Sequence, residues 1–384
     1  MKKNWFWICI GWSIWIVGCH SPTTSSDSGM PPQGFAIPAS QFVGLYFTAT
    51  DARYTSSALY WMNFRTGTVE SRLSGESGDP WVLWTSNRLF MANRSPLSNN
   101  AYFLAPETRR PTVQKATPGL NIQHGVSLGN GDILVSDWSS SALHQLHGKN
   151  LETVARYTPP GFAEAPKEPG GDLLRLSDGE TFYILALSHG LEAGYRANDG
   201  QTLTIWKEEQ AGKLQWVRSL PLSITTPHFL HPSAKGVWIM GLCAPFLAQQ
   251  GCKAGRAWFS FEDQQLSNSV SFSSLFLQSY GALIGGNTPN EAFAFVVKPE
   301  QPDTRRLAHL TWKTESALTA TVEIPVPLSS LGSPLLLFDP TSHILFIGNT
   351  ETNGGSMTLW DTHLKKVQHR MELERIPYNG TLAL

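Results

Sequence analysis

The chain has 384 residues, of which 15% are charged, and its formal net charge at pH 7 is −1. A typical globular chain carries about a quarter charged residues, so this surface is poor in charge. Apart from Lys2–Lys3 at the start, the basic doublets are Arg109–Arg110, Arg305–Arg306 and Lys365–Lys366, and they are scattered along the chain. Nucleic-acid binding needs a dense basic surface that neutralises phosphates, and we therefore exclude nucleic acid as a partner.

The first element is an apolar N-terminal run that follows Lys2 and Lys3 and ends at Gly18. A basic start, a short apolar stretch and a small last residue are typical of a secretory signal peptide. The sequence Ile-Val-Gly-Cys at 16–19 resembles the signal of bacterial lipoproteins. The resemblance implies cleavage before Cys19 and acylation of Cys19, palmitate included, which would anchor the protein in a membrane of the cell envelope. In such lipoproteins an Asp after the cysteine retains the protein in the inner membrane. In this sequence His20 follows Cys19, which favours the outer membrane. The sequence makes no prediction between the periplasmic and the surface face of that membrane.

A transmembrane anchor is the competing interpretation of this run. As a helix, residues 5–18 would span about 21 Å, whereas the hydrocarbon core of a bilayer is about 30 Å thick. Four tryptophans in the run are unusual, because Trp prefers the membrane interface to its centre. The short length favours the signal peptide.

A polar linker follows the signal. Residues 19–40 are rich in Ser, Thr, Pro and Gly, a composition that cannot bury a core and behaves as a flexible tether. We therefore divide the chain into a signal peptide (1–18), a lipidated Cys with its tether (19–40) and one folded domain (41–384).

The folded domain has the sequence pattern of an all-β protein. Its hydrophobic stretches are short, rich in β-branched and aromatic residues, and bounded by turn residues. They group into blocks with a period of about 40–50 residues, which is typical of the four-stranded antiparallel blades of a β-propeller. The blocks are 41–75, 79–118, 119–160, 170–223, 224–272, 273–328 and 333–374.

Two blocks resemble known propeller repeats. The segment 131–137, Gly-Asp-Ile-Leu-Val-Ser-Asp, is similar to the second strand of NHL-type repeats, and His343–Leu373 resembles a YVTN-type repeat. The resemblance implies an architecture and no activity, because propellers of these types serve both as binding scaffolds and as enzymes.

Seven blades is the predicted number, although two long blocks leave six or eight open. The first block contains three strands and lacks an innermost one, while the segment Tyr378–Leu384 follows the last block unassigned. We predict that this C-terminal segment is the innermost strand of the first blade, because open strand edges would otherwise stay unpaired.

Two cysteines remain in the folded domain. Cys243 and Cys252 flank a short loop, and in an oxidising exported compartment such a pair is predicted to form a disulfide. A redox pair or half of a metal site is the alternative, but no His or Cys pair with metal-ligand spacing stands beside it.

Polar residues in the predicted innermost strands are the candidates for a ligand site. His124, Asp172, His228 and Tyr280 fall in or near these strands, and polar groups that converge at a channel mouth would bind a ligand. His231 follows His228 at i+3, so on one strand the two rings point to opposite faces and do not easily share a metal ion. Tryptophans such as Trp81 could stack on sugars or peptides if they lay on a propeller face, but at alternating strand positions we interpret them as core residues.

Established catalytic patterns are absent from the sequence, including H-E-x-x-H, G-x-S-x-G, the P-loop and the Rossmann glycines. We therefore assign no catalytic residue, no metal ligand and no cofactor. The sequence favours a monomeric, non-enzymatic binding module in the cell envelope whose ligand is a protein, a peptide or an envelope polymer. The alternative is a propeller enzyme of the metal-dependent lactonase or hydrolase kind, or of the quinoprotein kind.

Overall fold

The computed structural model divides the chain into two units, Met1–Pro31 and Pro32–Leu384. It describes residues 35–384 except 77, 79, 94–99, 106–110, 118–120, 138–141, 161–169, 178, 189–190, 193–195, 198–200, 225–226, 234, 242–254, 268–269, 272–275, 278–282, 289, 299–300, 315–316 and 329–334. The signal, Cys19, Cys243, Cys252 and Tyr280 lie outside these residues, and so does the side chain of His228.

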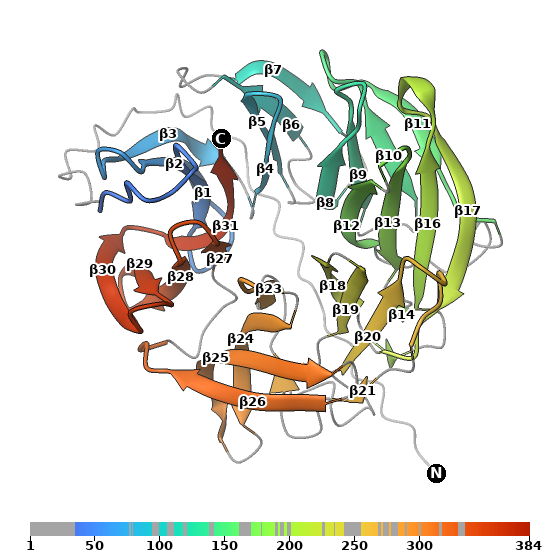
Figure 1. Ribbon diagram of the computed structural model, residues 1–384. Coiled ribbons are helices and arrows are strands. Elements are labelled where there is room, and N and C mark those ends of the chain that lie inside the picture. Colours follow the sequence, from blue (N-terminus) through green and yellow to red (C-terminus); the bar gives the residue numbers. More distant parts are fainter. Residues whose placement is uncertain are drawn as a thin grey trace, which may run out of the picture. The chain divides into compact units, whose positions relative to one another are not determined.

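The second unit is a seven-bladed β-propeller (Figure 1). Each blade is an antiparallel sheet whose strands follow one another from the axis outward. Blade 1 contains β31 (Ile376–Ala383), β1 (Gly44–Thr50), β2 (Ser57–Asn63) and β3 (Val69–Glu76). Blade 2 contains β4 (Trp81–Thr85), β5 (Arg88–Ala92), β6 (Asn100–Leu104) and β7 (Pro111–Ala116). Blade 3 contains β8 (Ile122–Ser127), β9 (Ile133–Asp137), β10 (Leu143–Leu146) and β11 (Thr153–Tyr157).

The remaining blades follow the same plan. Blade 4 contains β12 (Gly170–Ser177), β13 (Phe182–Ser188), β16 (Thr202–Glu208) and β17 (Leu214–Pro221). Blade 5 contains β18 (Pro227–Ser233), β19 (Gly236–Gly241), β20 (Gly255–Ser260) and β21 (Val270–Ser271). Blade 6 contains β22 (Phe276–Leu277), β23 (Leu283–Gly285), β24 (Glu291–Lys298), β25 (Gln301–Thr314) and β26 (Ala317–Ile324). Blade 7 contains β27 (Leu336–Asp339), β28 (Ile344–Glu351), β29 (Gly354–Asp361) and β30 (Lys366–Leu373).

Local irregularities explain the two long blocks without an extra blade. In blade 4, a small hairpin of β14 (Leu191–Glu192) and β15 (Arg196–Ala197) is inserted between β13 and β16. In blade 6, β22 and β23 both pair with β24, so two short strands share the innermost position. The only helix among the described residues is a single 3-10 turn, Gln210–Gly212, and no helix there is long and apolar enough to cross a bilayer.

The C-terminal strand closes the ring, as the sequence predicted. β31 pairs antiparallel with β1, with Gly44 opposite Ala383 and Tyr46 opposite Thr381. β31 therefore takes the innermost position of blade 1, which the first block of the sequence left empty. The pairing uses backbone groups that would form an open edge on β1.

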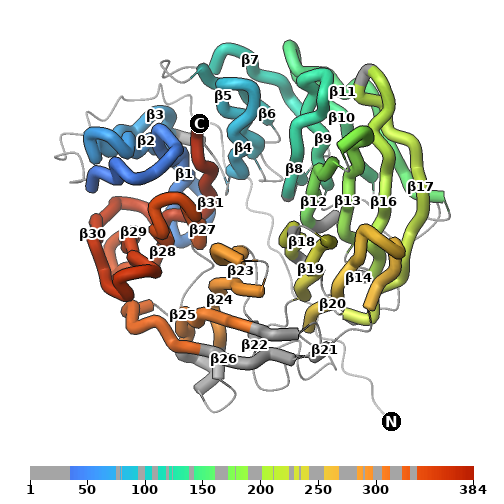
Figure 2. The backbone as a smooth tube through the Cα atoms, in the orientation of Figure 1, coloured from blue at the N-terminus to red at the C-terminus, as the bar shows by residue number. Residues whose placement is uncertain are grey.

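Strand direction gives the propeller two distinct faces. In blades 2, 3, 4, 5 and 7 the innermost strand is followed by a turn to the second strand, and the third strand is joined to the fourth at that same face; the strands of blades 1 and 6 run in matching directions. We call this the lower face; it carries the turns around Asn130 and His343. The upper face is the opposite one, on which the innermost strands begin at residues such as Trp81 and Ile122. Figure 2 shows the innermost strands arranged around the axis.

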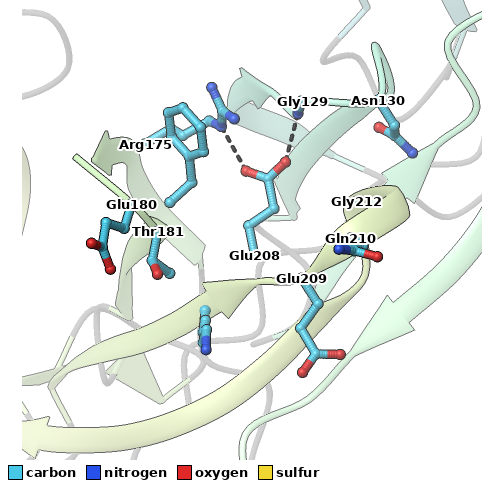
Figure 3. Close-up of a pocket in the computed structure, with 11 residues that line it drawn as sticks. Gly129, Asn130, Arg175, Glu180, Thr181, Glu208, Glu209, Gln210 and Gly212 are labelled. Atoms are coloured by element: carbon cyan, nitrogen blue, oxygen red, sulfur yellow. Dashed lines mark hydrogen bonds and ion pairs between the residues drawn. The ribbon is translucent and has the colours of Figure 1, made fainter. Parts of the chain in front are cut away.

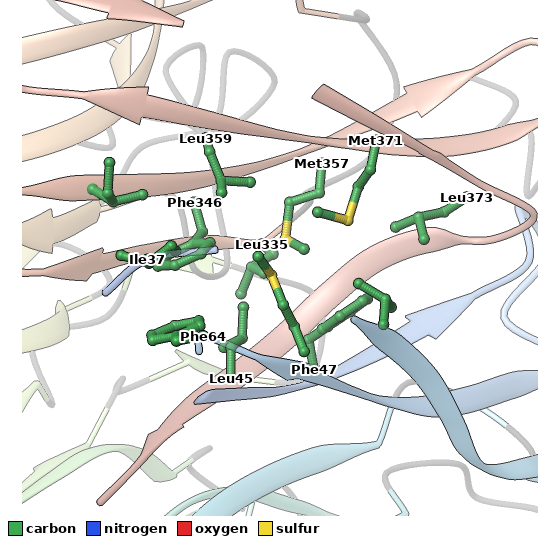
Figure 4. Packing of buried hydrophobic residues seen from close by; sticks show 13 residues of the cluster. Ile37, Leu45, Phe47, Phe64, Leu335, Phe346, Met357, Leu359, Met371 and Leu373 are labelled. Carbon is green, nitrogen blue, oxygen red and sulfur yellow. The ribbon is translucent and has the colours of Figure 1, made fainter. Parts of the chain in front are cut away.

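The hydrophobic core is divided among the interfaces between adjacent blades. Between blades 7 and 1, Phe346 stacks on Phe64 with ring centroids 5.6 Å apart, and Leu45, Met357 and Leu359 are fully buried around them (Figure 4). Because successive side chains of a strand point to opposite sides, each sheet contributes apolar residues to both neighbouring interfaces. This alternation leaves polar side chains mainly at the strand ends, where the two faces lie.

Residues before β1 pack on blades 1 and 7. The Ile37 backbone N–H donates to the Phe64 carbonyl at 2.6 Å, and the ring of Phe35 stacks on His369 with centroids 5.6 Å apart. The Gln41 N–H donates to the hydroxyl of Thr341, which lies in the first turn of blade 7. These contacts belong to the lower face, so residues 35–41 lie on that side of the propeller.

Candidate functional site

The innermost strands of neighbouring blades contact one another around the whole ring. All of them run in the same direction, so their first residues meet at the upper face. This arrangement gathers side chains that are far apart in the sequence, and the candidate site lies where blades 2, 3 and 4 meet.

His124 and Asp172 form a pair between blades 3 and 4. His124 Nδ1 lies 3.3 Å from Asp172 Oδ1, and the two side chains are 28% and 21% exposed. The pair is thus partly buried but still reaches solvent. The sequence predicted both residues for one site, and the structure brings them together.

Backbone donors hold the carboxylate of Asp172 in place. Its Oδ1 accepts the N–H of Leu173 at 2.8 Å, and its Oδ2 accepts the N–H of Leu230, in β18 of blade 5, at 3.0 Å. The carboxylate therefore bridges three blades and has little freedom to rotate. A fixed carboxylate at Nδ1 selects the imidazole tautomer that carries its proton there.

Trp81 completes the group from blade 2. Its ring centroid lies 6.5 Å from that of His124, with the ring planes inclined by 58°. Gly125 permits this approach, because a Cβ at that position would lie 3.2 Å from the indole and 3.0 Å from the Leu134 carbonyl oxygen. We call Trp81, His124 and Asp172 the axial site.

The sequence favoured a core position for Trp81 over stacking on a ligand, and the structure shows it packed partly buried against the core. Its ring does pack on Phe90 of the core, but it also lies beside His124 at the start of its strand. Tyr378, near the start of β31, contacts Tyr54 edge-on at 5.6 Å. Comparing the first residues of the innermost strands would have singled out Trp81.

The other predicted site residues are placed differently. His228 lies in the innermost strand β18, as predicted. His231 has a half-buried ring that packs against Gly285 of blade 6. Burial lowers the pKa of His231, and a hydrogen bond with the backbone of Thr288 opposes this effect. His231 is therefore a packing residue. Among the residues that the structure describes, no three His, Cys, Asp or Glu side chains converge as metal ligands would.

A second histidine–carboxylate pair lies within blade 3. His144 Nε2 is 3.9 Å from Asp137 Oδ2, and the side chains are only 11% and 4% exposed. Burial lowers the pKa of His144, partly offset by the charge of Asp137 and reinforced by that of Arg156. Because both side chains are buried, we interpret the His144–Asp137 pair as a structural feature rather than a ligand site.

A cavity of about 700 Å³ opens on the lower face between blades 3 and 4. Figure 3 shows Glu208 at its wall, contacting Arg175 and the backbone of Gly129. Glu208 Oε2 accepts from Arg175 Nε at 2.6 Å, and Oε1 accepts the Gly129 N–H at 2.6 Å. The Arg175 guanidinium also lies 3.6 Å from the ring centre of Phe182. Because the charges of Arg175 and Glu208 are already paired, we interpret these two residues as a contact that stabilises the interface between blades 3 and 4.

The geometry of the axial site suits a small polar molecule. It offers a flat aromatic surface, an imidazole held by a carboxylate, and partial access to solvent. Within the described part of the chain, His124 Nε2 makes no hydrogen bond with the protein, so it is available to a ligand or a water molecule.

Comparisons with known proteins support the fold. Neither a known family model nor a curated protein matches the sequence. A protein from Lactobacillus plantarum has a similar structure, with a TM-score of 0.62 at 10% identity over 90% of this chain and 100% of its own.

Two further similar structures carry functional descriptions. The periplasmic gluconolactonase of Pseudomonas aeruginosa has a TM-score of 0.61 at 14% identity, over 89% of this chain and 99% of its own. A putative 6-phosphogluconolactonase from Bacteroides fragilis has a TM-score of 0.60 at 11% identity, over 89% and 98%. At such low identity these similarities show a shared propeller fold and nothing about activity.

Proposed function

We propose that the protein is a hydrolase of small lactones, with the axial site as its active site. The observation that carries the proposal is the His124–Asp172 pair beside Trp81 at the axis. In this role His124 Nε2 accepts a proton from a water molecule as that water attacks the lactone carbonyl. The imidazolium then returns the proton to the ring oxygen as the acyl C–O bond breaks, which gives the open hydroxy acid. Asp172 is a positioning residue that orients the ring and stabilises the imidazolium that forms.

The substrate class is a sugar lactone. An indole such as that of Trp81 provides an apolar face on which a compact sugar ring can stack, and the upper face is reached from solvent. Two proteins of similar fold are described as a gluconolactonase and a putative 6-phosphogluconolactonase, which supports the same class of substrate here.

The test is hydrolysis of glucono-1,5-lactone by the purified protein, followed by acid release at constant pH. We expect turnover above the buffer rate, and His124→Asn should lower kcat by about 10²–10⁴-fold, the usual contribution of a general base. His363→Asn, which changes a turn residue of blade 7, is the matched control and should retain activity. A wild-type rate equal to that of buffer would overturn the proposal.

A binding module at the same site is the second candidate. Hydrolysis also needs a hydrogen-bond donor that stabilises the oxyanion. Among the described residues, His124 contacts Asp172 and Trp81, and the carboxylate of Asp172 cannot serve as that donor. A ligand of protein, peptide or envelope-polymer origin would need no such donor. Retention of envelope components by the wild type but not by Trp81→Ala, without turnover of lactones, would favour this function.

We also propose that the protein works at the envelope as a lipoprotein. The support is the Ile-Val-Gly-Cys sequence at 16–19 and the polar tether after it. Radiolabelled palmitate should enter the wild-type protein and not Cys19→Ala, and the wild type should fractionate with the outer membrane. Equal labelling of both forms would contradict acylation at this residue.

A further inference from the structure

The large hydrophobic side chains that remain exposed are concentrated on the lower face. Phe182 and Val43 stand at the ends of strands there, Phe261 and Leu364 lie in its turns, and Leu384 ends the chain beside them. More exposed apolar residues lie near the lower ends of outermost strands: Val154, Trp216, Val217 and Val367. Of the exposed large hydrophobic residues in the described ranges, only Tyr54 and Val322 lie toward the upper face.

These residues are distributed around the ring rather than along one blade. They belong to blades 1, 3, 4, 5 and 7. Single exposed hydrophobic residues are normal on protein surfaces, but their restriction to one face indicates a contact surface. Because they come from five of the seven blades, the exposed residues are spread over a broad area at the lower ends of the strands.

A cavity of mixed lining opens on the same face between blades 4 and 5. It has a volume of about 640 Å³, and its apolar wall includes Leu185, Ile205, Phe259, Val217 and Phe261, while Ser177, Lys207 and Gln264 add polar groups. Val217 and Phe261 are 40% and 36% exposed. The cavity therefore extends the exposed apolar surface into the interior of the propeller.

The first described residues of the chain lie on this face. Ile37 bonds to Phe64 and Gln41 bonds to Thr341, both at the lower turns. The chain before Phe35 carries the tether and the apolar run that ends at Gly18. Any membrane attachment through the N-terminus would thus connect to the lower face.

Charged residues on the lower face are of both signs. Lys149 and Lys213 are exposed at its turns, and so are Glu180 and Glu262. A surface of mixed charge has no strong preference for anionic headgroups. The apolar side chains are therefore the main feature that this face offers to a partner.

We propose that the lower face docks on the surface of a lipid bilayer, into which its exposed apolar side chains insert. The inference rests on the proposed N-terminal anchoring and goes beyond it, because it assigns an orientation: the axial site on the upper face points away from the bilayer. Interfacial binding of this kind depends on the apolar area that enters the headgroup region.

Photo-crosslinking to lipid tests this orientation in the full-length protein. A photoreactive benzoylphenylalanine replaces Phe261 or Leu364 on the lower face, and Tyr54 or Val322 as matched controls on the upper face. Each protein is reconstituted into phosphatidylcholine vesicles that contain a radiolabelled phospholipid. We expect at least five-fold more labelled lipid on the protein from Phe261 and Leu364 than from Tyr54 and Val322.

The outcomes separate docking from anchoring and from catalysis. Equal labelling from the two faces, or no labelling at any position, would overturn the docking surface. If the protein co-sediments with vesicles while Phe261 and Leu364 remain unlabelled, anchoring stands and the docking surface is wrong. Lactone hydrolysis in detergent is measured separately and does not depend on any of these results.

Discussion

The backbone N–H of Trp84 in blade 2 donates to the hydroxyl of Thr381 in β31 at 3.2 Å. The last strand of the chain is thus bonded to β1 through its backbone and to the next blade through a side chain. Asn379 adds a weaker bond to the Pro80 carbonyl at 3.4 Å. The strand that closes the ring therefore also holds blade 2 against blade 1.

Deletion of residues 379–384 tests this closure. We expect the Tm to fall by at least about 10 °C, because β1 loses its partner and the ring loses its closing contacts. Thermal unfolding followed by circular dichroism measures the change. Deletion of the exposed Leu384 alone is the control and should change the Tm by less than about 2 °C. An unchanged Tm in the longer deletion would show that β31 is dispensable.

Gly285→Ala tests the contact between the innermost strands of blades 5 and 6. A Cβ at this position would overlap the half-buried imidazole of His231, so we expect a loss of about 1–3 kcal/mol in the free energy of unfolding. Urea titration measures it. The double variant Gly285→Ala/His231→Ala should recover part of the loss, since the overlapping ring is gone; no recovery would place the strain elsewhere.

The stability of the protein should fall as the pH drops below about 6.5. Burial lowers the pKa of His144 and of His231 in the folded state below their ordinary value of 6.5. Between the folded and unfolded pKa values the unfolded chain binds more protons, so acid favours unfolding, and stability returns as the pH rises through 6.5. Urea titrations between pH 5 and 8 measure the dependence. His144→Gln should make it shallower, and identical slopes for variant and wild type would contradict the assignment.

The Arg175–Glu208 pair should stabilise the interface between blades 3 and 4. The Glu208 side chain is 6% exposed and that of Arg175 is 23% exposed, so Arg175→Met leaves a buried carboxylate with one backbone donor. We expect a loss of about 2 kcal/mol in the free energy of unfolding. Glu372→Ala breaks a comparable pair with Arg370 in which Glu372 is 70% exposed, and it should cost less than about 1 kcal/mol. Equal losses would contradict a role for burial.

Much of the fold was accessible to sequence reasoning because the determinants of a blade are local. The dipeptide Asn130–Gly131 is typical of a tight turn, and Gly131 has a φ of 85° there, in the left-handed region. The unassigned C-terminal segment and the incomplete first block together predicted the closure by β31, which the structure confirms. The inserted hairpin β14–β15 was not predicted, because two-residue strands carry no periodicity.

The candidate site was only partly accessible. The sequence placed His124 and Asp172 in innermost strands, but their 3.3 Å contact depends on how far each strand extends toward the upper face. The length of each strand toward the upper face depends on packing between blades, so it cannot be predicted from the local sequence around His124 or Asp172. Trp81 shows the same limit: its residue type fits the core, and only its position at the start of β4 reveals that it lies beside His124.

The pairing of Gly44 with Ala383 also constrains how the protein is made. Because one blade combines strands from both ends of the folded domain, β1 has no inner partner until β31 has been synthesised. The growing chain therefore remains an open arc until that point. The ring can close only when Ile376–Ala383 pair with β1.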